Sequence, residues 1–325
     1  MVVIEVARLN KPLPYKAQPA AWADAQLIMD ELFVQPLKEE KGVFRALTPD
    51  QLITYIYQRP WTEAHKEETV DQIRKWKTGQ QLAKPVKVTP KKDEIIPNQP
   101  TLAADGGVAT KTRPITPKAD ADVPGMAVAV PLKYYVGGTR MWAVSGSDPT
   151  FMPTKEPIPG VFTFSTTYVP NPRSDSLGEW ITKHCQIWGL HIIMHGDDHY
   201  ALFVCKQGQW RACAIDMVSC DLTCAELFQR AFMWFVNELS DHSTDDIMTL
   251  QFKNLTGRFE LKHNDSRVKE RMFIDKEEPT TNTGEGLTSL KAWFGQQSAG
   301  FSIVKVCWVD GEFDPRRYKS AVQQV

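Results

Sequence analysis

The stretch IWGLHIIMHGDDHYALFVC at residues 187–205 places the tightest constraint on how this chain folds. It consists of two apolar runs separated by a Gly-Asp-Asp triplet at 196–198. Apolar runs on either side of a Gly-Asp turn are typical of a β-hairpin. The next apolar stretch, residues 210–217, predicts a third strand and brings another carboxylate, Asp216. If the three strands pair side by side, Asp197 and Asp216 converge at one edge of the sheet.

Carboxylates that converge without a counter-charge repel one another, and they persist when a divalent cation neutralises them. Hard oxygen ligands of this kind favour Mg²⁺ or Mn²⁺. Two such ions about 3.5–4 Å apart stabilise the attacking and leaving oxygens of a phosphoryl displacement. The sequence therefore predicts that Asp197, Asp198 and Asp216 are the metal-binding and catalytic residues of a phosphoryl transfer enzyme. An Asp-rich turn without chemistry is the alternative, because Gly and Asp are common turn residues.

Two further patterns favour a polymerase over a two-metal nuclease. Lys111 and Arg113 stand two apart on an extended stretch, so their side chains point the same way and together can bind a triphosphate. The stretch TGEGLT at 283–288 contains two glycines that let the backbone approach a ligand, and it opens a helix whose N-terminus favours anions. A nuclease needs no triphosphate site. Seen alone, each pattern also fits a plain turn or helix cap.

Apolar spacing and turn residues predict the other elements of the chain. Helices repeat apolar residues at spacings of three and four, and strands appear as short apolar or alternating runs between Gly and Pro. We expect helices within residues 20–33, 48–58, 67–82, 222–239 and, after a loop, 281–297, and strands within 126–145, with a turn at Gly137-Gly138, and within 161–169 and 301–309.

Positive charge gathers in one part of a chain whose net charge is only -1. From Arg74 to Lys118 there are 10 Lys or Arg and 3 Asp or Glu, a local balance of 10 − 3 = +7. Prolines punctuate residues 83–120. This pattern predicts an extended basic arm that crosses an active site and contacts nucleic acid, and a flexible linker or a solvated basic surface is the alternative.

The remaining composition favours an intracellular, soluble protein. The 6 cysteines form no Cys-x-x-Cys pair, and the spacing of Cys220 and Cys224 lacks a second pair to complete a zinc site. The N-terminus has no basic stretch leading into an apolar run, so we expect no signal peptide. No apolar run is long enough to span a bilayer.

Taken together, these residues resemble viral RNA-dependent RNA polymerases. In that family a Gly-Asp-Asp hairpin is motif C, a strand ending in D-x4-D is motif A, a glycine-rich loop and helix is motif B, and a Lys-x-Arg arm is motif F. Here Asp216 and Asp221 form the D-x4-D pair and follow the Gly-Asp-Asp, and the glycine loop comes last. This order is similar to that of the permuted polymerases of permutotetraviruses and birnaviruses, and the resemblance covers roughly residues 108–310.

The resemblance implies an α+β fold with a right-hand palm, in which helices back an antiparallel sheet. Residues 1–125 would form a fingers-like region with the basic arm, and residues 126–325 the palm-like catalytic region. The implied activity is RNA-directed RNA synthesis from nucleoside triphosphates on an RNA template and primer, with Mg²⁺ or Mn²⁺, in the cytoplasm of an infected host cell. A non-catalytic RNA-binding or structural protein and a two-metal nuclease are the alternatives.

The resemblance also assigns roles residue by residue. Asp197 and Asp216 would bind the two metal ions with Asp198 assisting, and Asp221 would contact the ribose 2′-hydroxyl. The nucleotide site would further comprise Lys111, Arg113, Gly284, Gly286 and Thr288.

The chain departs from the family at three points. Ala292 occupies the position of an Asn that pairs with the sugar-sensing Asp of the family, so ribose selection needs another device. No motif places the lysine that acts as general acid, and Lys305 is the candidate for it. The stretch after residue 297 is too short for a thumb domain, so the chain is expected to be a fragment or to receive its thumb from another chain, and an unusually small enzyme is the alternative.

Overall fold

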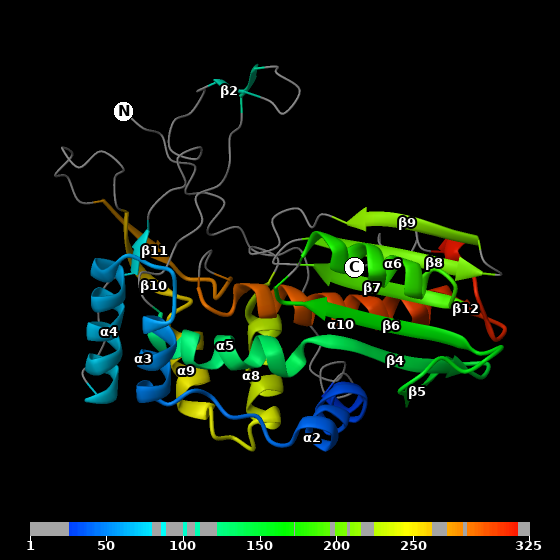
Figure 1. Ribbon diagram of the computed structural model, residues 1–325, viewed down its shortest axis with the longest axis horizontal. Helices are drawn as coiled ribbons and strands as arrows, with labels where there is room; N and C mark the ends of the chain where they lie inside the picture. Colours follow the sequence, from blue (N-terminus) through cyan, green and yellow to red (C-terminus); the bar gives the residue numbers. More distant parts are fainter. Residues whose placement is uncertain are drawn as a thin grey trace. The chain divides into compact units, whose positions relative to one another are not determined.

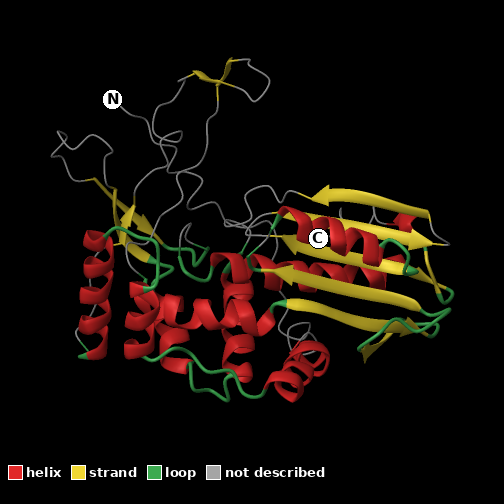
Figure 2. Ribbon diagram, viewed as in Figure 1, coloured by secondary structure: helices red, strands yellow, loops and turns green. Residues whose placement is uncertain are grey.

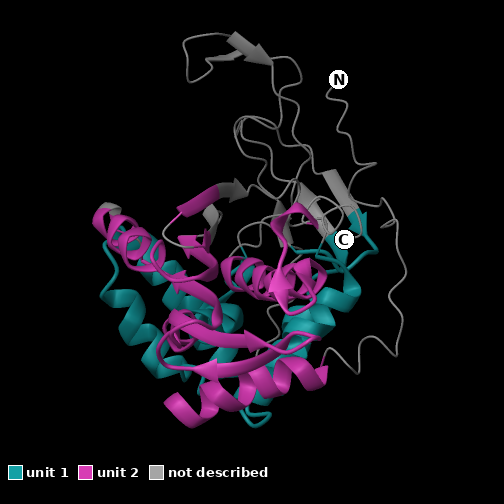
Figure 3. Ribbon diagram, turned by 90° about the vertical axis from the view of Figure 1, so that its right-hand side faces the viewer, with its two compact units in different colours: residues 1–19, 45–130, 219–288 teal, residues 20–44, 131–218, 289–325 magenta. Residues whose placement is uncertain are grey.

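Figure 1 shows the computed structural model of the chain, and Figure 3 colours the two compact units into which it divides. The first unit takes its described residues from Arg45–Val130 and Ser219–Thr288, and the second from Ala20–Phe44, Pro131–Val218 and Ser289–Val325. The division into residues 1–125 and 126–325 is a functional assignment and stays a prediction. The structure describes residues 26–79, 86–88, 100–102, 108–110, 122–171, 173–195, 199–206, 209–215, 224–261, 272–281 and 285–317.

The second unit is built on a six-stranded sheet with the strand order β5-β4-β6-β7-β8-β9 (Figure 2). The predicted hairpin is confirmed, since β7 and β8 pair antiparallel, and β9 pairs antiparallel with β8. The strand expected over residues 161–169 is confirmed as β6. The strands are β4 (Gly138–Ser145), β5 (Thr150–Thr154), β6 (Phe162–Val169), β7 (Gly189–His195), β8 (His199–Lys206) and β9 (Gln209–Ile215).

The expectation of a purely antiparallel sheet is wrong at one pair, because β6 and β7 run parallel. A helix that the sequence pattern did not predict, α6 (Ser174–His184), connects the two strands and carries the chain back to the start of β7. Parallel neighbours require a crossover of this kind and are usually covered on both faces. Accordingly residues 162–168 of β6 are all buried. The sheet is therefore mixed, and helices back it on two faces.

The long helix α10 (Thr288–Cys307) covers the other face of the sheet. Phe301 packs against Phe164 of β6 and Trp142 of β4, with ring centroids 4.9 Å and 5.0 Å away. A Cβ added at Gly300 would lie 2.7 Å from Phe164, so this glycine lets the helix approach the sheet closely. The strand expected over residues 301–309 is wrong, since the stretch up to Cys307 is helical and only Trp308–Val309 forms a strand, β12, paired with β13 (Glu312–Phe313).

The N-terminal helices of the second unit complete this aromatic core. Helical residues 26–29 lead into a π-helical turn, η2 (Asp30–Val34), and then α2 (Gln35–Lys41). Phe33 lies 5.1 Å from Trp142 and 5.2 Å from Phe301, ring centroid to ring centroid. The helix expected within 20–33 is thus confirmed from residue 26 onward, and its first part lies outside the described residues. A short 3₁₀ turn, η3 (Pro315–Arg317), follows β13.

The first unit contains the predicted helices α3 (Pro49–Tyr57), α4 (Glu63–Lys77) and α8 (Glu226–Leu239), together with α9 (Asp245–Lys253). Thr48 begins α3 as expected, because its hydroxyl accepts from the Gln51 amide and the Gln51 side chain caps the Thr48 amide in return. Leu52 and Ile56 pack with Val70 and Ile73 of α4 in a fully buried cluster. A three-stranded sheet completes the unit, in the order β1 (Val86–Val88), β10 (Gly257–Leu261) and β11 (Met272–Lys276). The short strands β2 (Pro100–Leu102) and β3 (Val108–Thr110) pair with each other.

The strands expected over residues 126–136 are wrong, since this stretch belongs to helix α5 (Val123–Val136). A helix buried on nearly all sides carries apolar residues all round, so the spacing that marks an amphipathic helix disappears. The strand expected after the turn is confirmed as β4, and Gly138, with φ 101°, makes the reversal between α5 and β4. Among the described residues, no helix combines the length and apolar character needed to cross a membrane.

Candidate functional site

The strands that lead into the predicted catalytic residues end together at one edge of the sheet. His195 at the end of β7 pairs with His199 at the start of β8, and Tyr200 pairs with Ile215 at the end of β9. Val169, at the end of β6, pairs with His195. The chain therefore enters residues 196–198 and residue 216 from neighbouring strand ends. Asp197, Asp198 and Asp216 themselves lie outside the described residues, as do Lys111, Arg113, Asp221 and Gly284.

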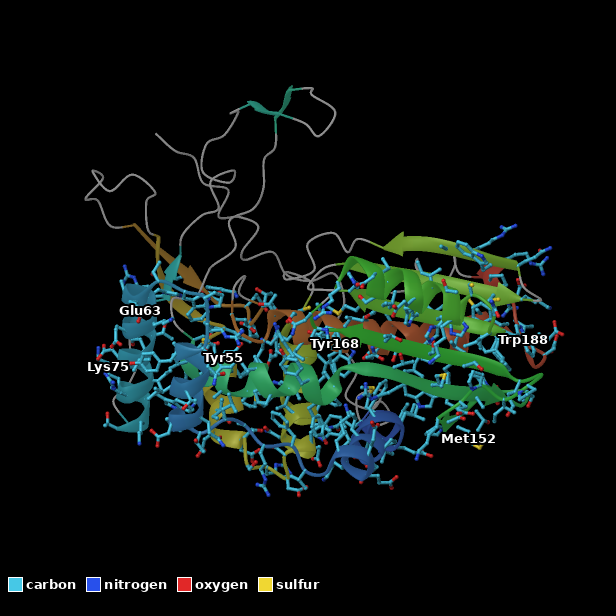
Figure 4. All side chains as sticks on the ribbon, in the orientation of Figure 1. Tyr55, Glu63, Lys75, Met152, Tyr168 and Trp188 are labelled. Carbon is cyan, nitrogen blue, oxygen red and sulfur yellow. The ribbon has the colours of Figure 1, made fainter. Side chains whose placement is uncertain are left out.

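Helix α10 begins at this same end of the sheet. Trp293, one turn into the helix, packs on Tyr168 near the end of β6, with ring centroids 6.1 Å apart. At the other end, the Trp308 indole donates to the Gly146 carbonyl over 3.0 Å and its ring packs on Phe162. Figure 4 labels Tyr168 and Trp188, which lie toward opposite ends of the sheet. The helix thus runs from the strand ends at His195 and His199 toward the far end.

Lys305 lies in the last turn of α10, and its side chain is exposed. With a rise of 1.5 Å per residue, the helix carries it about 18 Å beyond Trp293. Lys305 therefore stands at the end of the sheet away from His195 and His199. This placement does not favour Lys305 as the general acid, and the position of that lysine stays a prediction.

The glycine-rich stretch is anchored where the structure describes it. Gly286 packs on the first turn of α5, where an added Cβ would lie 3.2 Å from Gly125 and Met126 backbone atoms. Thr288 is the first residue of α10, and its hydroxyl donates to the Glu285 carbonyl over 3.0 Å. Ala292, at the position of the family's Asn, is buried and offers no polar group. The predicted loop that runs into a helix is confirmed at this point.

Metal-binding groups are scarce in the part of the structure that can be described. No cluster of three or more His, Cys, Asp or Glu side chains occurs there that could hold a metal ion. His195 beside the predicted turn lies with Nε2 3.4 Å from the Ser176 hydroxyl of α6. Asp197, Asp198 and Asp216, the predicted metal ligands, lie outside the described residues, so the metal site stays a prediction.

Two buried histidines beneath α6 are a second group that chemistry could use. His191 of β7 is fully buried, with Nδ1 2.7 Å from the Ser165 hydroxyl and Nε2 2.9 Å from the Ile187 carbonyl. The carbonyl can only accept, so Nε2 carries the hydrogen and Nδ1 accepts from Ser165. His184 donates from Nδ1 to the Trp180 carbonyl over 2.9 Å. Both rings are held neutral by packing, which is the pattern of structural histidines.

Burial lowers the pKa of His191 to about 4 from its ordinary 6.5, so the stability of the fold should decrease in acid. As pH falls, the unfolded chain takes up the proton before the folded chain does. The contribution of His191 to the free energy of unfolding is therefore fully present above pH 6.5 and is lost as pH falls toward 4. With these two pKa values, the free energy of unfolding should be about 2 kcal/mol lower at pH 5 than at pH 7.5 from this residue alone. Urea unfolding at both pH values measures it. His191→Gln should flatten the slope, and an unchanged slope in that variant would contradict the assignment.

The residues that sequence reasoning missed are the anchors of the glycine-rich stretch, above all Gln229, Gly125 and Asp122. The Asp-Val-Pro-Gly run at 122–125 contained a usable signal, because Asp followed by Pro is typical of a helix start. Gln229 had no such signal, since one of its hydrogen-bond partners, the Thr281 hydroxyl, lies 52 residues away in the sequence.

Comparison with known proteins adds no relative: no family model, no curated protein and no solved structure matches this chain. Its function therefore rests on its own residues and their arrangement.

Proposed function

We propose that this chain is the catalytic palm of an RNA-dependent RNA polymerase with permuted motifs. The observation that carries the proposal is the register of β7, β8 and β9. His195 opposite His199, and Ile215 opposite Tyr200, bring the chain into Gly196-Asp197-Asp198 and into Asp216 from adjacent strand ends. Neighbouring strands lie about 4.8 Å apart, so carboxylates that follow adjacent strand ends can reach a shared pair of metal ions.

The donor set fits Mg²⁺ or Mn²⁺, because Asp197, Asp198 and Asp216 supply only carboxylate oxygens. Asp197 and Asp216 would hold the ions and Asp198 would assist. Bound there, the ions would offset the charge that develops on the attacking and leaving oxygens. The mixed sheet with α10 along one face would give these strand ends a rigid support, since Gly300 seats the helix directly on Phe164.

The proposed reaction is nucleotidyl transfer to RNA. The 3′-hydroxyl oxygen of the RNA bonds to the α-phosphorus of a nucleoside triphosphate, the bond from that phosphorus to the bridging oxygen breaks, and pyrophosphate leaves. Lys111 and Arg113 would bind the triphosphate, and Asp221 would accept a hydrogen bond from the ribose 2′-hydroxyl. Gly284 and Gly286 would let the backbone approach the template or nucleotide, and Thr288 would line the site.

The template would follow the basic surface between Arg74 and Lys118, in part on the last turn of α4. There Lys77 pairs with Asp50 over 2.8 Å and Lys75 pairs with Asp71. Exposed pairs of this kind are weak, so RNA phosphates can replace their carboxylates. Binding should weaken as salt rises, because phosphate contacts release counterions. A thumb supplied by another chain and a site of action in the cytoplasm of an infected host cell belong to the same proposal.

A crystal of the chain soaked with Mn²⁺ and read by anomalous scattering tests the proposal without requiring a thumb. A manganese peak ligated by Asp197 and Asp216 supports a polymerase or nuclease. Incubation of the full chain with an RNA template-primer, nucleoside triphosphates and Mn²⁺ then separates the two, since a polymerase extends the primer and a nuclease shortens the RNA without the triphosphates. Carboxylates on distant parts of the fold would overturn the proposal and favour a non-catalytic RNA-binding protein.

Lys111→Ala and Arg113→Ala should each weaken nucleoside triphosphate binding by roughly tenfold or more, because each removes a charge-assisted contact worth about 1.5–3 kcal/mol. Fluorescence titration with a labelled triphosphate measures the dissociation constant. Lys155→Ala, an exposed lysine beyond β5, is the matched control and should bind as the parent does. Equal affinity in all three variants would remove the triphosphate role.

A further inference from the structure

The glycine-rich stretch, residues 283–288, is tied to the rest of the first unit just before it, at Thr281, and within it, at Gly286. Both sites are closely packed. Thr281 is 1 % exposed, and Leu287, which follows Gly286, is fully buried. The ties come from two helices, α8 and α5, that are distant in the sequence. Their chemistry differs, one being a side-chain hydrogen bond and the other a close backbone approach.

The first tie is the amide of Gln229 in α8, which is 2 % exposed. Its Nε2 donates to the Thr281 hydroxyl oxygen over 2.8 Å and to the Cys224 carbonyl over 2.8 Å. A carboxamide nitrogen carries two N–H donors, so these two bonds occupy both donors of Gln229. Away from water such bonds cannot be exchanged for solvent, and losing one leaves a polar group without a partner. One buried side chain therefore sets the distance between residues 224 and 281.

The second tie is the contact of Gly286 with the first turn of α5. A Cβ added at Gly125 would lie 2.6 Å from Cγ of Asp122, so a side chain there would push this carboxylate out of its place. That carboxylate caps the helix, since Asp122 Oδ1 accepts from the Gly125 amide over 3.1 Å and from Gln251 Nε2 of α9 over 2.6 Å. The end of the glycine-rich stretch thus rests on a helix start that α9 holds in place.

The positions of these ties along the chain give them a functional meaning. Cys224 follows Asp221 by three residues, and Thr281 precedes Gly284 by three. Gln229 therefore links the segment that carries the proposed ribose contact to the segment that carries the proposed nucleotide loop. In the family that the sequence resembles, an Asn at the position of residue 292 pairs directly with the sugar-sensing Asp. Here residue 292 is an apolar Ala, which cannot make that link.

We infer that Gln229 is a positioning residue, which couples the segments of Asp221 and Gly284 through Cys224 and Thr281 and so sets how the nucleotide sugar is held. The inference rests on the proposed function for its meaning in catalysis. The coupling itself, as a physical link between the two segments, can be tested without any activity.

The physical test uses hydrogen–deuterium exchange on the full chain. Gln229→Leu keeps the volume of the side chain but removes both donors, and Thr281→Val removes one acceptor. Each should raise the exchange of peptides that contain residues 224–229 and 280–287 by about tenfold. Thr281→Ser keeps the hydroxyl and should exchange as the parent does. If the exchange of both peptides is unchanged in Gln229→Leu, the coupling is overturned.

The functional test uses primer extension with ribonucleoside and 2′-deoxyribonucleoside triphosphates. Gln229→Leu and Thr281→Val should raise the KM for the ribonucleotide about tenfold and reduce the preference for ribose, and Thr281→Ser should keep both at the values of the parent. A residue with only a structural role would lower the active fraction and the Tm while KM and sugar preference stay constant, and that result overturns the inference. If the parent chain extends no primer although its Mn²⁺ site is occupied, the proposed function fails instead, and exchange alone decides the coupling.

Discussion

Asp216→Asn is expected to lower primer extension by roughly a thousandfold or more, and Asp197→Asn should do the same. Asn matches Asp in size but carries no charge, so the variant removes the ability to neutralise a divalent cation and little else. Like charges that converge without a cation destabilise a fold, so each variant should fold at least as well as the parent when no metal is present. Primer extension, with the Tm measured alongside, separates loss of chemistry from loss of structure. Calorimetric titration with Mn²⁺ should show weaker binding in both.

The matched control for these variants is Asp148→Asn. Asp148 is exposed in the turn between β4 and β5, at the end of the same sheet that lies away from His195 and His199. The same chemical change there should leave extension and Mn²⁺ affinity unchanged. Equal activity in Asp148→Asn, Asp197→Asn and Asp216→Asn would remove the two-metal site and with it the polymerase proposal.

The sequence was most informative where local pattern and tertiary structure agree. The hairpin of β7 and β8 could be predicted because two apolar runs flank a turn whose residues favour reversal. Helix α3 could be predicted because Thr48 and Gln51 form a capping box from residues close in sequence. The triplet at 196–198 therefore has a structural frame that the sequence alone predicted. Its chemistry stays a prediction, because those residues lie outside the described part of the chain.

Elements buried on several sides were harder to predict. In α5, apolar residues occupy most of the helix surface, so the 3.6-residue spacing is lost and the stretch resembles a strand. The end of α10 resembles a strand because its apolar residues cluster in the short run from Phe301 to Val309, although the buried positions Phe301, Val304 and Cys307 follow helical spacing. The residues that anchor the glycine-rich stretch could not be predicted for a different reason. Gln229 meets Thr281 across 52 residues of chain, and no local pattern encodes such a contact.

The parallel pairing of β6 and β7 also depends on a tertiary contact, at Gly189. This residue pairs with Thr163 at the first position of the parallel ladder, and the amide of Thr163 donates to the Trp188 carbonyl over 2.9 Å. A Cβ added at Gly189 would overlap the Thr163 carbonyl oxygen and lie 2.8 Å from the carbonyl carbon. Backbone atoms cannot turn aside as a flexible side chain can, so a side chain at 189 forces the two strands apart.

Gly189→Ala should therefore lower the free energy of unfolding by about 3 kcal/mol, at the upper end of what overpacking costs. Gly178→Ala is its control, because Gly178 lies in the interior of α6 with open space around it. That variant should gain about 0.5–1 kcal/mol, since Ala favours the helix more than Gly does. Urea unfolding of both variants measures the difference. If Gly189→Ala is as stable as the parent, then β6 and β7 do not approach each other as described, and the sheet that supports the strand ends at His195 and His199 has a different register. The opposite signs expected for the same Gly→Ala change make the comparison a test of the sheet rather than of glycine itself.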